Sequence, residues 1–505
     1  MKKFDRNYIF YHLVFDFFAL LFILFFFFIE NIIDSVIAKD NLGKLILIFI
    51  ALFVSIYTLM TVYNVFFVKT SGYELKDSEV VCKRGVLFKK HSILEYKKIH
   101  AVNKKQNIIQ KLFKIAVLTL DSGSTNTSHL AEIVIYEKES VVDELIKKIK
   151  LKQENPDSVI ETTEILEHPT KENLYKFSSK TKFIYSLINV VASLFILLFI
   201  TVCVLALFTV LYITVKEKVA GTLGVVLLVS LISCLGICLF SFILSIISAF
   251  VGYYDFKVYK SSKDIEINYG LLVKNSNTFK LNKIKGVVIS QGIIKRLFKY
   301  VTVKLEVIGY NGQSGENNNQ NQAVSTGILF PLCKESELES NLSKVLPSYV
   351  PKKKENSSVK FFPYISWSLF FLSIFFALTT GICELVFLVL KLRAIYYFVL
   401  WGIALLSFAV IILIIALNNY LAYKNNGITI TNDTICVYNG GFTRYCTIIK
   451  TKNLIAIENI TTPLREKRGI YSFNVHYHTN ATTNVVKLNI VDKSLVEKLN
   501  SLLEY

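Results

Sequence analysis

The chain has 505 residues, of which 53% are hydrophobic and 19% charged, and its formal net charge is +19 at pH 7. Such an apolar composition excludes an ordinary soluble protein. The length leaves room for about three or four domains.

Six apolar segments are each long enough to cross a bilayer, which takes roughly 20 residues. They cover residues 8–29, 45–68, 184–215, 219–253, 364–390 and 394–417. The first follows the basic stretch "MKKFDRN" but is too long for a signal peptide and lacks a small-residue cleavage site, which indicates an uncleaved anchor. Short links join the spans in pairs, so the sequence predicts three transmembrane hairpins.

The distribution of basic residues predicts the orientation. The links within the hairpins hold six of the 57 basic residues: Lys39, Lys44, Lys216, Lys218, Lys391 and Arg393. Because Lys and Arg are enriched on the cytoplasmic side of membrane proteins, we expect both termini and the polar stretches between hairpins to be cytoplasmic. This makes the chain a multi-pass protein of the cell membrane.

A repeated motif divides the polar stretches into equivalent units. "QNIIQKLFK" at 106–114 returns as "QGIIKRLFK" at 291–299, and Gly85 and Gly270 precede the two motifs by the same number of residues. A more divergent third copy begins at Gly440. Internal repetition at a long period indicates a repeated structural unit, so we expect three copies.

Each copy reads as about six or seven strands followed by an amphipathic helix. The apolar positions of the three predicted helices, which would lie on one face of each helix, are Val142, Leu145, Ile146 and Ile149; Leu338, Leu342 and Val345; and Leu495, Leu499 and Leu502. Strands closed by one helix predict a small α+β domain in which the helix covers the open end of a curved sheet.

These elements predict an alternation of hairpins and domains. The hairpins occupy residues 1–68, 183–253 and 361–419, and the domains occupy residues 69–182, 254–360 and 420–505.

The stretch "KKIHAVNKKQNIIQKLFKIAVLTLDSG", residues 97–123, resembles the signature of bacterial pleckstrin-homology-like (PH-like) domains of the second type. The alternation of hairpins and domains resembles the YdbT-like family of bacterial membrane proteins. The resemblance implies a curved antiparallel sheet capped by a C-terminal helix, and it admits a role in envelope stress or in tolerance of membrane-active peptides. The chain departs from the family pattern at His100, where Gln is usual, and at Lys114 and Lys299, which replace a turn glycine that the third copy keeps as Gly469.

The sequence contains no nucleotide-binding loop, zinc-ligand spacing or nucleophile motif. We therefore expect a protein that is not an enzyme and that has no catalytic residue, cofactor or metal. His476 and His478 alternate on a predicted strand and could face one way, but a solvated strand face is favoured because no third ligand is near in sequence. Aromatic residues are not interleaved with the basic ones, so nucleic-acid binding is not expected.

Basic clusters after the repeated glycine are the candidate binding residues: Lys111, Lys114, Lys295, Arg296, Lys299, Arg465, Lys467 and Arg468. A Lys or Arg near an anionic leaflet contributes about 1 kcal/mol to membrane binding. We expect a short helical turn that buries Phe113 against the sheet and directs its charges to anionic phospholipid or to a protein partner. The alternative is that these charges only maintain solubility and topology.

Two acidic residues fall inside predicted spans, Asp16 and Glu384. Intramembrane charges mark candidate functional sites, although pairing or snorkelling near the ends would also explain both. The eight cysteines show no paired spacing and are expected to be free thiols. The polar insertion at 311–327 is expected to form a mobile loop tip.

Two hypotheses follow from these patterns. In the first, the protein is a membrane scaffold whose three PH-like domains bind protein partners, each other in a homo-oligomer, or anionic lipid. In the alternative, it is a transporter or lipid-handling protein whose six-helix bundle surrounds Asp16.

Overall fold

The computed structural model describes residues 1–38, 42–99, 101–121, 133–154, 172–188, 236, 239–307, 326–352, 354–356, 372–374, 376–378, 380–381, 384, 394–478 and 483–492. The chain forms two compact units. The first comprises Met1–Lys176 and Tyr254–Lys283, and the second comprises Phe177–Tyr253, Ile284–Val307 and Asn317–Tyr505.

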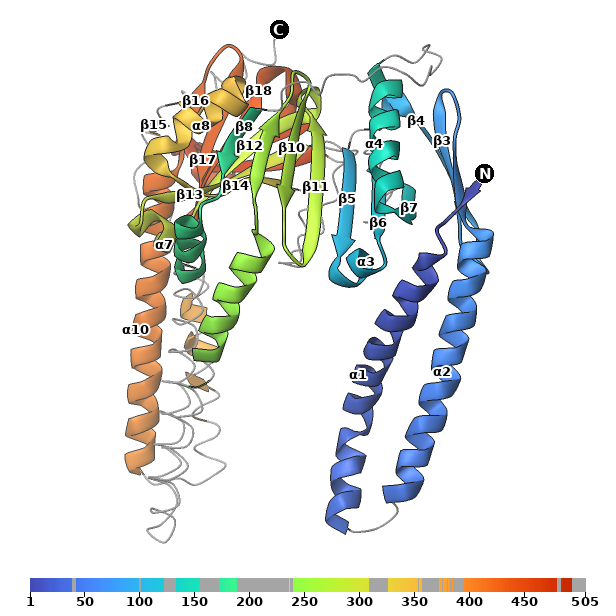
Figure 1. Cartoon of the computed structure of the whole chain (residues 1–505). Coiled ribbons are helices and arrows are strands. Elements are labelled where there is room, and N and C mark those ends of the chain that lie inside the picture. Colours follow the sequence, from blue (N-terminus) through green and yellow to red (C-terminus); the bar gives the residue numbers. More distant parts are fainter. Residues whose placement is uncertain are drawn as a thin grey trace. The chain divides into compact units, whose positions relative to one another are not determined.

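The first unit begins with a hairpin of two long helices, α1 (Asn7–Ala38) and α2 (Leu42–Thr70), which run antiparallel (Figure 1). Large apolar side chains stay exposed along both helices, including Phe18 at 62% and Leu59 at 72%. Helices that are apolar on their outer faces are suited to lipid.

Three helices in the described part of the chain are long and apolar enough to cross a membrane, those containing Asn7–Leu24, Gly43–Thr70 and Phe408–Asn425. The third belongs to α10 (Ala394–Asn425). The six predicted spans are therefore confirmed only in these three, because most of the other three segments lies outside the described residues.

The first repeat folds into two antiparallel sheets instead of one continuous curved sheet. The first has the order β1-β2-β3-β4, and β5, β6 and β7 follow each other in the second. The strands are β1 (Lys2–Lys3), β2 (Gly72–Leu75), β3 (Glu79–Arg84), β4 (Lys90–Glu95), β5 (Ala101–Asn107), β6 (Ile115–Asp121) and β7 (Ile133–Lys138). A short 3-10 helix, η1 (Tyr96–Lys98), separates β4 from β5 and interrupts the ladder.

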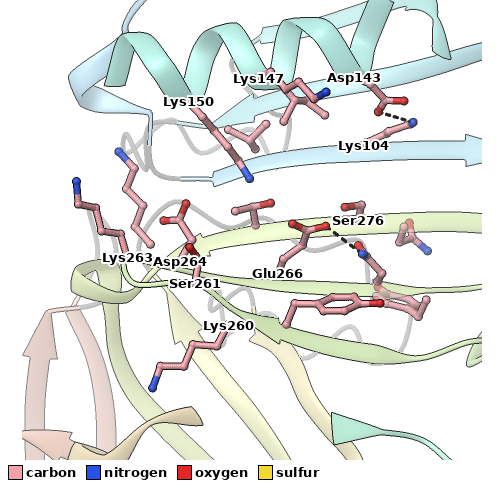
Figure 2. A pocket seen from close by; sticks show the side chains of 18 of the residues that line it. Lys104, Asp143, Lys147, Lys150, Lys260, Ser261, Lys263, Asp264, Glu266 and Ser276 are labelled. Carbon is pink, nitrogen blue, oxygen red and sulfur yellow. Dashed lines mark hydrogen bonds and ion pairs between the residues drawn. The ribbon is translucent and has the colours of Figure 1, made fainter. Parts of the chain in front are cut away.

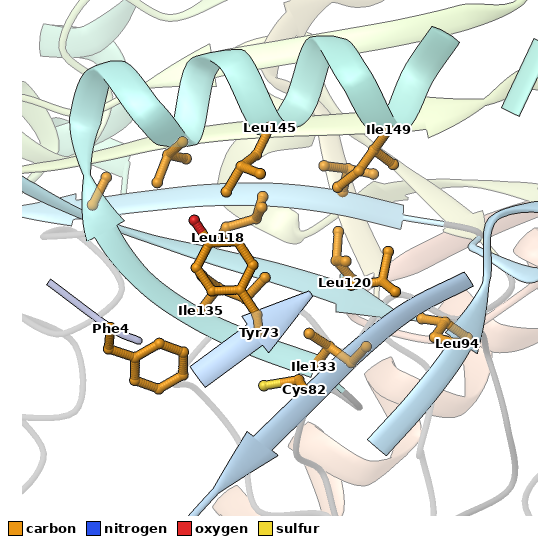
Figure 3. Packing of buried hydrophobic residues seen from close by; sticks show 14 of the residues in the cluster. Phe4, Tyr73, Cys82, Leu94, Leu118, Leu120, Ile133, Ile135, Leu145 and Ile149 are labelled. Carbon is orange, nitrogen blue, oxygen red and sulfur yellow. The ribbon is translucent and has the colours of Figure 1, made fainter. Parts of the chain in front are cut away.

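The core of this repeat lies between the two sheets and under α4 (Glu139–Glu154), as Figure 3 shows. Leu118 and Ile133 from the second sheet and Leu94 from the first are almost completely buried, together with Leu145 and Ile149 from α4. Each such side chain contributes about 1.5–3 kcal/mol through burial. The predicted apolar face of this helix is confirmed, since Val142 is also buried and Ile146 packs against the core.

The second sheet of the first repeat continues directly into the first strands of the next repeat. Its seven strands have the order β7-β6-β5-β11-β10-β9-β8. The added strands are β8 (Glu172–Lys176), β9 (Lys257–Lys260), β10 (Asp264–Tyr269) and β11 (Val273–Lys280). The backbone hydrogen bonds between β5 and β11 therefore join two repeats edge to edge within one sheet.

The second unit contains an equivalent seven-stranded sheet with the order β14-β13-β12-β18-β17-β16-β15, and a three-stranded sheet with the order β19-β20-β21. The strands are β12 (Ile284–Gln291), β13 (Tyr300–Val307), β14 (Thr326–Lys334), β15 (Glu355–Asn356), β16 (Gly427–Ile430), β17 (Thr434–Asn439), β18 (Arg444–Lys450), β19 (Leu454–Ile460), β20 (Ile470–His478) and β21 (Thr483–Asp492). The core of the third repeat includes Ile435, Phe473 and Leu488.

The C-terminal helix of the second repeat is α8 (Leu338–Val345), whose predicted apolar residues Leu338, Leu342 and Val345 are buried. The predicted helix face of the third repeat, Leu495, Leu499 and Leu502, lies outside the described residues.

Each repeat also uses a short strand from before its hairpin. β1 pairs with β2, β8 with β9 and β15 with β16, and in each pair a hairpin separates the two strands in sequence. The range 69–182 therefore includes a strand, β8, that joins the first strands of the following repeat. Both ends of a hairpin are thereby tied into one sheet.

Candidate functional site

In every repeat a glycine with positive φ begins the turn that follows the second strand after the hairpin, which is β3, β10 or β17. Gly85, Gly270 and Gly440 have φ of +116°, +103° and +98°. L-residues avoid this region because Cβ collides with the backbone. A Cβ on Gly85 would lie 2.0 Å from the Phe88 carbonyl oxygen, and one on Gly440 would lie 2.0 Å from that of Thr443. The backbone conformation of the turn thus explains why a glycine recurs at this position in every repeat.

The same turn is hydrogen-bonded to the last residue of the preceding long helix in the first and third repeats. The hydroxyl of Thr70, the last residue of α2, donates to the Gly85 carbonyl over 2.8 Å. In the second repeat the turn glycine N–H donates to the Tyr254 carbonyl over 2.8 Å. In the third, the Asn425 amide at the end of α10 donates to the turn carbonyl over 2.8 Å. In the first and third repeats these bonds hold one end of the domain beside its candidate span.

The repeated motif itself forms a short helix in every copy: α3 (Ile108–Leu112), α7 (Ile293–Leu297) and α11 (Pro463–Glu466). In the first copy the backbone N–H of Asn107 donates to the side chain of Gln110 over 2.8 Å and completes a capping box. The turn residues after the helices, Lys114, Lys299 and Gly469, have φ of +55°, +56° and +65°. The two lysines therefore adopt the conformation for which the third copy uses glycine.

The helical turn is confirmed, but its expected docking is only partly correct. Ile109 and Phe113 pack against the core of the first repeat, as expected, but both side chains stay partly buried. Ile108 is 51% and Leu112 75% exposed. A helix of five residues has too few turns to bury all its apolar side chains against one sheet.

Contacts with α1 place this helix at the start of the first candidate span. The side-chain amide of Asn7 donates to the Phe113 carbonyl over 3.1 Å, and the rings of Phe10 and Phe113 stack with centroids 6.4 Å apart. Asn7 is the first residue of α1. The exposed apolar residues of α3 therefore lie where the chain enters the span.

Exposed apolar and basic residues gather at this end of the first repeat. Leu87 is 83% and Phe88 92% exposed in the Gly85 turn, which follows β3 and is bonded to Thr70 at the end of α2. We call the set Leu87, Phe88, Ile108, Lys111 and Leu112 the membrane-end surface. Its mixture of apolar and cationic side chains is typical of protein surfaces that contact the headgroup region of a bilayer.

The basic candidates of the three motifs are placed differently. Lys111, Lys114 and Lys299 are exposed. Lys295 is half-buried, donates to the Thr302 hydroxyl over 2.7 Å and lies 5.9 Å from the centre of the Tyr185 ring. Burial, with nearby Lys304 as the second cause, lowers the pKa of Lys295 to about 8.

Arg296 is also partly buried, and its Nε and Nη2 atoms have no hydrogen-bond partner among the described residues. The expectation that all motif charges point outward is therefore wrong for Lys295 and Arg296: the Lys295 ammonium donates to Thr302, and Nε and Nη2 of Arg296 are buried. In α11, Arg465 is half-buried, whereas Lys467 and Arg468 beyond it are exposed.

The glutamine that begins the motif has a role that sequence reasoning missed. Gln106 is 2% exposed, and its Nε2 donates to the Ile115 carbonyl over 2.9 Å and to Glu139 over 3.3 Å. Across the β5–β11 pair, Gln106 lies opposite Lys274. Although burial opposes it, hydrogen bonds from Gln106 and Lys104 and the charge of Lys274 lower the pKa of Glu139.

The β12–β18 pair repeats this arrangement in the second unit. Gln291 donates to the Tyr300 carbonyl over 3.1 Å and to Glu335 over 3.2 Å, and it lies opposite Arg444. The Arg444 guanidinium donates to Gln291 over 2.6 Å and to Glu335 over 2.9 Å. We call this glutamine, glutamate and facing basic residue the seam clasp. The constant spacing of the two glutamines from the turn glycine was the available signal.

A groove of about 1820 Å³ lies over the first of these junctions, between α4 and strands β9 to β11 (Figure 2). Seven lysines and five acidic side chains line it, and the ammonium of Lys104 contacts Asp143 at 2.7 Å and Glu139 at 3.3 Å. Figure 2 shows Lys147 and Lys150 extending from α4 above the strands. The charges nearly balance, so we assign the groove no ligand of its own.

The intramembrane candidates are accounted for differently. Asp16 is 7% exposed and accepts a hydrogen bond from Asn64 of α2 over 2.7 Å, with His12 at 3.2 Å. It thus joins α1 to α2. Glu384 is helical and exposed.

The remaining candidates are ordinary structural residues. His476 lies 3.3 Å from Glu458, and no group of three metal-ligating side chains occurs among the described residues. Cys82, Cys333, Cys436 and Cys446 are buried free thiols, as predicted. The other four cysteines and most of the 311–327 insertion lie outside the described part of the chain.

Two kinds of sequence comparison agree with this architecture. A profile described as "Bacterial PH domain" matches residues 19–151, 185–340 and 373–505. Together these matches cover most of the sequence, so the chain belongs to the bacterial PH domain family. It is also similar to the UPF0699 transmembrane protein YdbT of Bacillus subtilis (strain 168), with 23% identity over 418 residues, 80% of this chain and 78% of that protein. The chain is thus a membrane protein with three bacterial PH-like repeats, as the sequence predicted.

Proposed function

We propose that the protein is a membrane-anchored scaffold whose PH-like repeats rest on the anionic cytoplasmic leaflet and present their sheets to protein partners. The proposal assigns binding and no catalysis to the domains. The observation that carries it is the membrane-end surface. Its exposed apolar and basic side chains lie in the Gly85 turn, which is bonded to the end of α2, and in α3, whose following residue Phe113 is bonded to the start of α1.

The physical argument rests on the exposed apolar area. Leu87, Phe88 and Leu112 are each more than 70% exposed, and exposed apolar side chains next to basic ones at the end of a candidate span are suited to contact with lipid. Burial of such a side chain in an apolar environment contributes about 1.5–3 kcal/mol. Lys111 adds attraction to anionic lipid that decreases with salt. The charge and the apolar residues therefore favour the same partner.

The alternative of a transporter receives no comparable support from the described residues. Asp16, around which that hypothesis was built, is engaged with Asn64 and His12. A carboxylate that joins two helices of one hairpin has a structural explanation.

Depth-dependent fluorescence quenching tests lipid contact in the full chain. Trp367 and Trp401 are the two tryptophans, and replacing both with Phe removes the background. Leu112→Trp in this background should be quenched by lipids that are brominated near the headgroup, and the quenching should increase when phosphatidylglycerol replaces phosphatidylcholine.

Leu151→Trp is the matched control, because Leu151 is a 40% exposed leucine on α4 in the same repeat. It should not be quenched. Equal quenching at both positions, or no quenching at position 112, would refute the leaflet contact.

The orientation is part of the proposal and has its own test. Single cysteines in "VIAKD", residues 36–40, should react with an impermeant thiol reagent on intact cells, in a background cleared of other reactive thiols. Cysteines placed at 311–327 should not react. Labelling of that insertion from outside would place the domains on the opposite side.

A further inference from the structure

One sheet edge of the first repeat has no partner. The order β1-β2-β3-β4 places β4 at the end of its sheet, so within the described residues its outer edge is unpaired. The equivalent strands β11 and β18 each pair with a strand of the preceding repeat. An open edge presents unpaired N–H and C=O groups to other strands.

The two occupied edges show which chemistry an open edge of this type recognises. Their registers are identical: Gln106 lies opposite Lys274, and Gln291 lies opposite Arg444, with each basic residue four positions after its turn glycine. In the first repeat this position is Lys89, which is exposed and has no ion pair within the described structure. The basic member of a seam clasp is therefore present directly before β4, without its glutamine and glutamate.

An exposed apolar residue marks the same edge. Eight positions after the turn glycines, Thr278 is 9% and Ile448 0% exposed, and they face Val102 and Val287 across the two junctions. At the equivalent position Ile93 is 55% exposed. Pairing of β4 with an outside strand would bury it against an aliphatic side chain in the same way.

A second copy of the chain does not supply a suitable strand. The strand equivalent to β5 and β12 at an open edge is β19, and Thr461 just after it takes the place of the glutamine. The Thr461 hydroxyl donates to the Ile470 carbonyl over 3.1 Å and to the Thr462 carbonyl over 3.4 Å. Each clasp glutamate directly follows a strand residue: Glu139 follows Lys138, the partner of Ile115, and Glu335 follows Lys334, the partner of Tyr300. In the third repeat the equivalent pair is Ile470 and Asp492, so Lys493 stands at the position of the glutamate. The sequence of the third repeat therefore offers a lysine at the clasp glutamate position, and a lysine does not complement the charge of Lys89.

We infer that the β4 edge binds an edge strand of a PH-like unit from a different protein. That strand would place a glutamine opposite Lys89 and an aliphatic residue opposite Ile93, and its domain would supply a carboxylate at the start of its C-terminal helix. The partner extends the sheet by antiparallel pairing, as β5 and β12 do within this chain. The inference specifies the partner class of the scaffold but does not depend on its contact with lipid.

Photocrosslinking of the full chain in its native membrane tests this pairing. Benzoylphenylalanine at position 93 should give one adduct with another protein, and mass spectrometry should map the linked residue to a strand that contains a glutamine and precedes a second PH-like strand. Lys89→Glu should reduce the yield by about tenfold.

Lys90→Glu is the matched control, because successive residues of a strand point to opposite faces and only Lys89 occupies the clasp position. It should leave the adduct largely intact. Absence of an adduct, equal loss in both variants, or linkage to residues 454–461 of a second copy would overturn the inference. None of these outcomes bears on quenching at position 112, so the two proposals fail separately.

Discussion

The guanidinium of Arg444 donates to the side-chain oxygen of Gln291 over 2.6 Å, across a junction between two repeats. The same guanidinium contacts Glu335 at 2.9 Å, so one residue of the third repeat bonds a strand and a helix start of the second. Backbone hydrogen bonds alone would allow several registers between two strand edges, because the same donors and acceptors recur along each strand. A side chain with a single complementary position fixes the register.

Removing this basic residue should therefore weaken the junction. We expect Arg444→Ala to lower the free energy of unfolding by about 1–2 kcal/mol, since its charge-assisted bonds are partly exposed to solvent. Denaturant unfolding in micelles measures the loss. Arg468→Ala, which removes an exposed arginine on the same repeat, should have little effect. A double-mutant cycle with Gln291→Ala that gives no coupling energy would contradict the clasp.

Gly440→Ala should destabilise the third repeat. Its φ is +98°, and the added Cβ would lie 2.0 Å from the Thr443 carbonyl oxygen, so we expect a cost of about 1–3 kcal/mol. Gly252→Ala is the control, because a Cβ there meets no atom within 4 Å. Thermal unfolding of both variants in the same detergent compares them, and equal midpoints would show that the turn tolerates a side chain.

Phe113→Ala should cost less than truncation of its fully buried neighbour Ile115. Phe113 is partly buried between the core and α1, whereas Ile115 is 0% exposed. We expect about 1–2 kcal/mol for Phe113→Ala and about 2–5 kcal/mol for Ile115→Ala. Chemical denaturation of each variant in micelles provides both values. A larger loss at Phe113 would show that its ring belongs to the core.

Lys295 should make stability increase with pH in the alkaline range. Its pKa in the folded protein is about 8, below the ordinary value of 10.5, so the unfolded chain binds more protons between these pH values. Stability then rises as pH increases from about 8 to 10.5. Lys295→Met should exceed the parent in stability by about 1–3 kcal/mol at pH 7, and this advantage should shrink above pH 8. A pH-independent difference between the two proteins would argue against the lowered pKa.

Asn64→Leu should loosen the first hairpin by removing the donor to Asp16. Interhelical hydrogen bonds in membranes contribute about 0.6–2 kcal/mol, and the bond measures 2.7 Å. Unfolding in detergent, or the rate of proteolysis near α2, should report the change. Asn64→Gln retains an amide donor and is the control. If Asn64→Leu is as stable as the parent, Asp16 needs another explanation.

The amino-acid sequence by itself determined the repeat, the apolar helices and the buried faces of α4 and α8. These features depend on local periodicity: Leu145 and Ile149 recur at helical spacing, and Gly85, Gly270 and Gly440 recur because only glycine readily adopts the turn conformation. Local patterns of this kind persist whatever the rest of the chain does.

Only the tertiary structure decided how the repeats join. The pairing of β5 with β11 uses backbone groups that every residue carries, so side-chain patterns do not reveal which edges meet. The roles of Gln106 and Gln291 depend on a residue from the next repeat in space. The exposure of Leu112 depends on the small size of α3 and on the place that Phe113 takes beside α1, and both follow from packing between segments distant in sequence.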